Sequence, residues 1–148
     1  YIGDNSIIGN NVLIREYCDI EANSLIGASS EITRTITQGD IECHSAFFGD
    51  SIISAGCKFG FGYVSANVRN DREEIFSDIK GDKVNTKKKS LGLICGNDTR
   101  SGVRSYSMPG KMIGNNCNIG PGTPIMENVP DNTNMFAKFE YVKKQNNG

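Results

Sequence analysis

The chain has 148 residues, a formal net charge of -1 at pH 7, one histidine and five cysteines. This length suits a single domain, and the near-neutral charge argues against nucleic acid or an anionic membrane as the main partner. No apolar run is long enough to span a bilayer, so we expect a soluble protein. The cysteines are odd in number and never spaced as CxxC, which argues against a disulfide framework or a zinc site and favours a reducing, cytoplasmic compartment.

Isoleucine recurs every six residues in the first part of the chain, at positions 2, 8, 14, 20, 26 and 32. Such a period is typical of a hexapeptide parallel β-helix, in which three hexads close one triangular coil. We therefore expect Ile2 to stack on Ile20, Ile8 on Ile26 and Ile14 on Ile32. The position two residues before each isoleucine holds a small side chain, and Cys18, Cys57 and Cys117 occupy it, so we interpret these cysteines as packing residues.

The period slips between about Thr37 and Phe48 and resumes at Ile53, Phe59 and Ser65. A third run places Cys95, Ser101, Ser107, Ile113, Ile119 and Ile125 at the same spacing. We predict an all-β single domain over residues 1–148, with about six coils divided between 1–67 and 90–129.

Residues 68–89 break the period and are rich in charge. Ile75, Ser77 and Ile79 alternate with polar or aromatic residues ahead of a Gly81-Asp82 turn, which predicts a projecting β-arm. The lysines at 87–89 are either a solvated face or a phosphate contact, and the arm as a whole could be a subunit contact. After Pro130 the repeat ends, and 130–148 is expected to cap the solenoid with an amphipathic strand over 134–144.

His44 is the one side chain whose usual pKa suits a general base near neutral pH. A single histidine at a register break could equally be structural, so its residue type leaves both interpretations open. Gly60 and Gly62 bracket a turn whose N–H groups could face a ligand oxygen. No cluster of metal-ligand type accompanies His44, so no metal is expected, and a carbonic anhydrase that needs several histidine ligands is disfavoured.

Three stretches, HSAFFGDS at 44–51, FGFGYVSAN at 59–67 and VRND at 68–71, carry a family resemblance. They are similar to the C-terminal acetyltransferase domain of bifunctional N-acetylglucosamine-1-phosphate uridylyltransferases, above all to the archaeal sugar-1-phosphate nucleotidylyltransferases with a β-helix tail. Lys80-Gly81-Asp82-Lys83 and Pro109-Gly110-Lys111 resemble runs in the same proteins.

The resemblance implies a left-handed β-helix, a homotrimer with sites between subunits, acetyl-CoA as cosubstrate and an amino-sugar 1-phosphate as acceptor. It implies that His44 deprotonates the sugar amine while the N–H of Phe61 polarises the acetyl carbonyl, which is the pairing that acyl transfer needs. Gly60, Gly62 and Lys111 are the other residues expected at the cofactor, and Asn67, Phe47, Lys58, Arg34 and Glu31 those expected at the acceptor. It also implies that the chain is a fragment lacking an N-terminal nucleotidylyltransferase domain.

The chain departs from the family pattern at three of these positions. Phe47 replaces a tyrosine, Lys58 replaces an asparagine, and the bulky Phe61 stands where a small residue is usual. In addition, Arg72-Glu73-Glu74 occupies the part of the arm where lysines are expected to meet the sugar phosphate. Each lost polar contact costs about 1–3 kcal/mol. A non-catalytic trimerisation or regulatory domain is therefore the alternative to the acetyltransferase.

Overall fold

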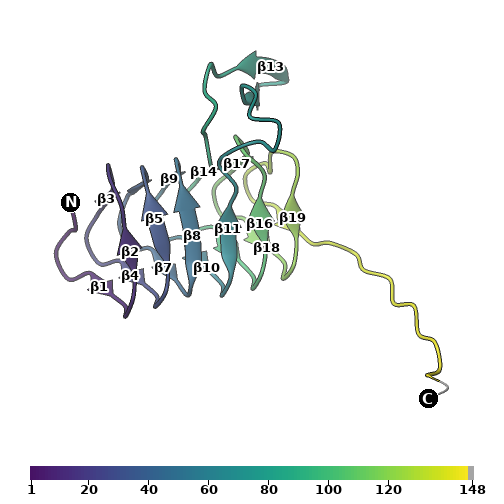
Figure 1. Cartoon of the computed structure of the whole chain (residues 1–148), viewed down its shortest axis with the longest axis horizontal. Helices are drawn as coiled ribbons and strands as arrows, with labels where there is room; N and C mark the ends of the chain where they lie inside the picture. The colour runs from purple at the N-terminus through teal and green to yellow at the C-terminus, as the bar shows by residue number, and fades with distance from the viewer. Residues whose placement is uncertain (147–148) are drawn as a thin grey trace.

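A computed structural model describes residues 1–146 and shows a solenoid of parallel β-strands with one projecting hairpin (Figure 1). The solenoid has three faces. The first is a seven-stranded sheet of β1 (Ile7–Ile8), β4 (Leu25–Ile26), β7 (Glu42–Cys43), β10 (Lys58–Phe59), β15 (Arg100–Ser101), β18 (Asn118–Ile119) and β20 (Asn134–Met135). The second is a six-stranded sheet of β2 (Leu13–Ile14), β5 (Glu31–Thr33), β8 (Ala46–Gly49), β11 (Tyr63–Ser65), β16 (Tyr106–Ser107) and β19 (Pro124–Ile125). The third is a five-stranded sheet of β3 (Asp19–Ile20), β6 (Ile36–Thr37), β9 (Ile52–Ile53), β14 (Ile94–Cys95) and β17 (Met112–Ile113).

The stacking expected from the sequence is confirmed: Ile2 pairs with Ile20, Ile8 with Ile26 and Ile14 with Ile32. The chain makes about seven turns, one more than the sequence indicated, because the shortened corners fit more coils into the same length and the repeat continues past Pro130 to β20. This arrangement is consistent with the left-handed β-helix that the resemblance implies. The described residues include no helix, and hence none that could cross a membrane.

The register slip comes from shortened corners. Only residues 34–35 separate β5 from β6, and only 44–45 separate β7 from β8, so that Ile32 pairs with Phe48 sixteen residues later. Three aromatic rings fill the interior of these coils, with centroid distances of 4.9 Å for Phe48 and Phe59 and 4.7 Å for Phe59 and Tyr63. Large aromatic side chains therefore fill the interior of the coils whose corners are shortened.

The arm is an antiparallel hairpin of β12 (Phe76–Ile79) and β13 (Asp82–Asn85), and it stands out from the solenoid in Figure 1. Its two-residue turn is Lys80-Gly81, with φ of 51° and 92°, one residue earlier than expected. A bridge between Val68 and Ser90 closes its base.

The C-terminal segment differs from the predicted cap. Asn134–Met135 adds to the seven-stranded sheet, but residues 136–146 form no strand and lead away from the solenoid (Figure 1). Phe136 and Phe139 lie against Gly120 and Gly122 at a corner of the solenoid but stay mostly exposed, as does Tyr141, so they do not close its interior. The last two residues of the predicted cap, 147–148, lie outside the described residues.

Candidate functional site

His44 lies at the corner between the seven-stranded and six-stranded sheets, which we call the first corner (residues 44–45 and, one coil on, 60–62). Its side chain is exposed, and no hydrogen bond to the imidazole is found within residues 1–146. A cavity of about 350 Å³ lies beside it, lined also by Lys58 and Gly60. The structure therefore brings three of the predicted site residues together.

The glycine turn stacks directly on this corner. The N–H of His44 donates to the carbonyl of Phe59 at 3.2 Å, and the N–H of Gly62 donates to the carbonyl of Ser45 at 2.8 Å. Between Gly60 and Gly62, the N–H of Phe61 has no acceptor in the described part of the chain. Amides at the same corner of other coils are also free, so the distinction of Phe61 is its place next to the histidine.

Phe47 and Glu31 lie on the outer face of the six-stranded sheet, side by side in register. Together with Gly62 they line a shallow hollow of about 260 Å³. Glu31 is held by Arg15, whose Nη1 lies 3.1 Å from its Oε1. This hollow borders the first corner, so these two residues are near His44 but outside its cavity.

Arg34 and Asn67 lie elsewhere, at the second corner, where the six-stranded sheet turns toward the five-stranded one (residues 34–35 and 50–51 and the start of the arm). Both contact Asp50: Arg34 through Nε at 2.7 Å and Nη2 at 3.0 Å, and Asn67 through Nδ2 at 2.6 Å. Strand geometry puts this corner roughly 15–20 Å from His44. Within one chain, therefore, the predicted acceptor residues are divided between two corners.

Asp50 is the centre of this second-corner cluster and was not predicted from the sequence. Its side chain is 13% exposed. Burial alone would raise the pKa of this carboxyl, but hydrogen bonds from Arg34 and Asn67 outweigh burial and hold the pKa below its usual value. The Asp50 hydrogen bond in turn raises the pKa of the Arg34 guanidinium.

We expect Asp50→Asn to lower the free energy of unfolding at pH 7 by about 1–2 kcal/mol, since a charge-assisted pair is lost but Arg34 is partly in water. Asparagine tolerates the φ of 48° at this position. Asp40→Asn is the matched control, because Asp40 has a φ of 51° and no ion pair among the described residues. A carboxyl with a depressed native pKa stabilises above its unfolded pKa and ceases to do so as the pH falls through the native pKa. Urea unfolding should thus show a gap between the variants at pH 7 that closes in acid, and equal losses at pH 7 would contradict the cluster's role.

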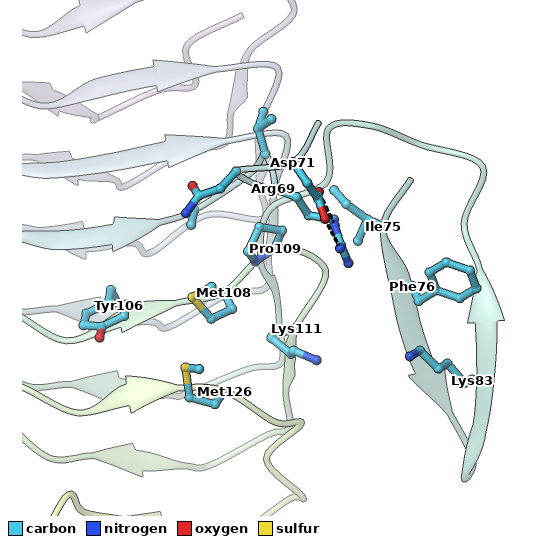
Figure 2. Close-up of a pocket in the computed structure, with 13 residues that line it drawn as sticks. Arg69, Asp71, Ile75, Phe76, Lys83, Tyr106, Met108, Pro109, Lys111 and Met126 are labelled. Atoms are coloured by element: carbon cyan, nitrogen blue, oxygen red, sulfur yellow. Dashed lines mark hydrogen bonds and ion pairs between the residues drawn. The ribbon is translucent and has the colours of Figure 1, made fainter. Parts of the chain in front are cut away.

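Lys111 lies in a larger cavity, of about 690 Å³, between the arm and the solenoid (Figure 2). Tyr106, Met108 and Met126 approach it from the solenoid, and Phe76 and Lys83 from the hairpin. The Nζ of Lys111 is 4.0 Å from an Asp78 carboxylate oxygen, and its side chain is 17% exposed. The structure does not bring Lys111 to the His44 cavity, because Lys111 directly precedes β17 of the five-stranded sheet, beyond the second corner.

Sequence reasoning missed two charged residues of the His44 cavity, Glu42 and Arg100. Each precedes an interior residue directly, as Lys58 precedes Phe59, and the pairing places Glu42, Lys58 and Arg100 in one outward column. The six-residue register could have found them. Among the described residues no group of three or more His, Cys, Asp or Glu side chains is placed to hold a metal ion.

Comparison with known proteins identifies relatives along most of the chain. Residues 1–34 match the family described as "Bacterial transferase hexapeptide (six repeats)". The bifunctional protein GlmU of Methanocaldococcus jannaschii is 33% identical over 130 residues, covering 87% of this chain and 32% of that protein. A bifunctional sugar-1-phosphate nucleotidylyltransferase/acetyltransferase of Sulfurisphaera tokodaii is 34% identical, covering 82% of this chain and 30% of the relative. The chain thus spans about a third of the length of the curated relatives it matches.

Two solved structures share the fold. The acetyltransferase domain of PglB from Neisseria gonorrhoeae superposes with a TM-score of 0.68 at 14% identity, over 88% of this chain and 54% of that one. A variant of GDP-perosamine N-acetyltransferase from Caulobacter crescentus, in complex with CoA and GDP-perosamine, gives 0.54 at 14% identity, over 89% and 54%. From its repeat, its fold and these relatives, the chain is a hexapeptide-repeat domain homologous to the C-terminal part of the bifunctional GlmU and sugar-1-phosphate nucleotidylyltransferase/acetyltransferase proteins.

Proposed function

We propose that this chain is an acetyl-CoA-dependent N-acetyltransferase domain that acts on an amino-sugar 1-phosphate, with His44 as the general base. The observation that carries the proposal is an exposed imidazole, unpaired within residues 1–146, that borders a cavity next to the free N–H of Phe61. The acetyltransferase activity named for the Sulfurisphaera tokodaii relative supports the same chemistry. We also propose that the domain belongs to a longer cytoplasmic chain with a nucleotidylyltransferase domain.

In this mechanism a ring nitrogen of His44 accepts a proton from the acceptor amine as the amine attacks the thioester carbonyl carbon. The N–H of Phe61 donates a hydrogen bond to the carbonyl oxygen, where negative charge develops. A carbon–nitrogen bond forms, the carbon–sulfur bond breaks, and the thiol leaves with a proton. No side chain needs to be acylated, so no paired serine or cysteine nucleophile is required.

The remaining predicted residues divide between the two ligands in this proposal. Gly60 and Gly62 flank the thioester at the first corner, while Lys58, Phe47 and Glu31 border the acceptor. Arg34, Asn67 and Lys111 are too far away to reach the same ligands within one chain. They would have to come from a neighbouring subunit, with Lys111 at the cofactor.

A homotrimer supplies that neighbour. In a closed ring each subunit presents one face to a different face of the next, which would set the first corner of one chain against the second corner or arm of another. The faces that would meet in that arrangement are the seven-stranded and five-stranded sheets, and both carry outward apolar side chains: Ile7 and Leu25 on the first, Ile36 and Ile52 on the second. We expect sedimentation equilibrium to give three times the chain mass, and a monomer at assay concentration would exclude this shared site.

The test of the function is thiol release from acetyl-CoA in the presence of glucosamine 1-phosphate or galactosamine 1-phosphate. We expect release that depends on the amino sugar, together with an N-acetylated product identified by mass spectrometry. No release with either acceptor and no binding of coenzyme A would support the non-catalytic trimerisation domain instead.

A further inference from the structure

The cavity beside His44 is lined by three charged side chains from three neighbouring strands. Glu42 on β7, Lys58 on β10 and Arg100 on β15 are paired in register on the outer face of the seven-stranded sheet. Adjacent strands lie about 4.8 Å apart, so Lys58 and Arg100 can reach one small ligand together. His44 directly follows β7 and borders the same space.

The charges in this column do not balance. The Nζ of Lys58 is 2.8 Å from Oε1 of Glu42. The guanidinium of Arg100 is exposed and has no ion pair or hydrogen bond in the described part of the chain. Two cations therefore share one carboxylate. The excess positive charge sits next to the imidazole, and a guanidinium offers two parallel N–H donors to an oxyanion.

Two other cations near the predicted site are already neutralised, and Arg104, which lies beside Gly62 without an ion pair in the described part of the chain, does not line the His44 cavity. Arg34 is bound by Asp50 and Glu16, and Arg69, which lines the arm cavity, is bound by Asp71. Their donors would have to leave a carboxylate before they could hold a phosphate. Arg100 needs no such exchange.

Acceptor chemistry also favours a cation close to His44. In glucosamine 1-phosphate and galactosamine 1-phosphate the amine and the phosphate are on adjacent ring carbons, so whatever holds the phosphate must lie within a few ångströms of the base. We propose that Arg100, assisted by Lys58, binds the phosphate of the acceptor beside His44; this inference rests on the proposed function. It assigns to the solenoid face the task that the resemblance gives to lysines early in the arm, where this chain has Arg72-Glu73-Glu74 instead.

The first test is Arg100→Gln, which removes the charge from an exposed side chain. We expect KM for glucosamine 1-phosphate to rise about tenfold, the lower end of what a charge-assisted hydrogen bond contributes. KM for acetyl-CoA and for unphosphorylated glucosamine should not change. Lys80→Gln, at the tip of the arm, is the matched loss of one exposed positive charge and should leave every constant as in the unmodified protein.

Glu42→Gln provides a test of opposite sign. It frees Lys58 from its carboxylate, so we expect KM for glucosamine 1-phosphate to fall, by about threefold at low salt, with the gain lost as ionic strength screens the charge. A rise in KM for acetyl-CoA in Arg100→Gln, with the acceptor unaffected, would mean that the cations hold a phosphate of coenzyme A and would overturn the proposal.

Calorimetric titration with glucosamine 1-phosphate separates this proposal from the proposed function. If the unmodified protein binds this ligand without transferring acetyl, and Arg100→Gln weakens binding about tenfold, the phosphate site stands and the acetyltransferase falls. Equal binding by both proteins, or by neither, overturns the phosphate site whether or not acetyl transfer is seen.

Discussion

Replacing His44 by alanine is expected to lower kcat for acetyl transfer by about 10²–10⁴-fold, the range that a positioned general base contributes. A protonated amine cannot attack the thioester, the sequence has no second histidine, and the Glu42 carboxylate in the same cavity is held by Lys58. KM for both substrates should change much less than kcat, because the imidazole acts on the proton in the transition state. Initial rates of thiol release with glucosamine 1-phosphate measure the effect.

The control for His44→Ala is Gln38→Ala, which truncates another exposed corner side chain far from the cavity. Both variants should unfold at the temperature of the unmodified protein, since neither side chain has a hydrogen bond to lose within residues 1–146. Retention of full activity in His44→Ala, with thiol release still dependent on the acceptor, would assign the proton transfer to solvent and remove His44 from the mechanism.

The fold was predictable because the interior residues recur every six positions in the sequence. Ile20, Ile26 and Ile32 point inward at fixed spacing, and a solenoid is the structure in which residues eighteen apart can stack. The number of coils and the length of the shortened corners were not predictable. Where a corner loses two residues, the strict six-residue period disappears from the sequence, and Phe48 takes the interior position on Ile32. The C-terminal segment misled for a different reason: its alternating apolar side chains resemble a strand, but only Asn134–Met135 pairs with the sheet, and the outer edge of β19 stays open among the described residues.

The candidate site was only partly predictable. Stacking places His44, Lys58 and Gly60 together: His44 and Gly60 each directly follow a strand of the seven-stranded sheet at the same register, and Lys58 lies within that sheet. Asn67 looked like an acceptor residue, yet its amide is bound to Asp50 at the other corner. Periodicity gives the face on which a residue lies and says nothing of which face of another subunit meets it, so the composition of a shared site cannot be read from one chain.

The N–H of Phe61 can be removed without changing the fold if Phe61 is replaced by proline. Residues Gly60-Phe61-Gly62 and Gly120-Pro121-Gly122 occupy the same corner in different coils, as the pairing of Phe59 through Ser101 to Ile119 shows. Proline is therefore accommodated at this point of the corner, and the Phe61 N–H has no acceptor to lose within the described residues. We expect Phe61→Pro to fold as the unmodified protein does.

Loss of that donor should lower kcat by about 10²–10³-fold, as removal of one hydrogen bond to a developing oxyanion does elsewhere. Phe61→Ala is the matched control, because it removes the same exposed ring but keeps the N–H, and it should retain most of the activity. The ratio of kcat between the two variants thus isolates the amide from the side chain. If both variants lose activity equally, the ring of Phe61 and not its amide contacts the substrates; if neither does, the carbonyl oxygen is polarised from another subunit.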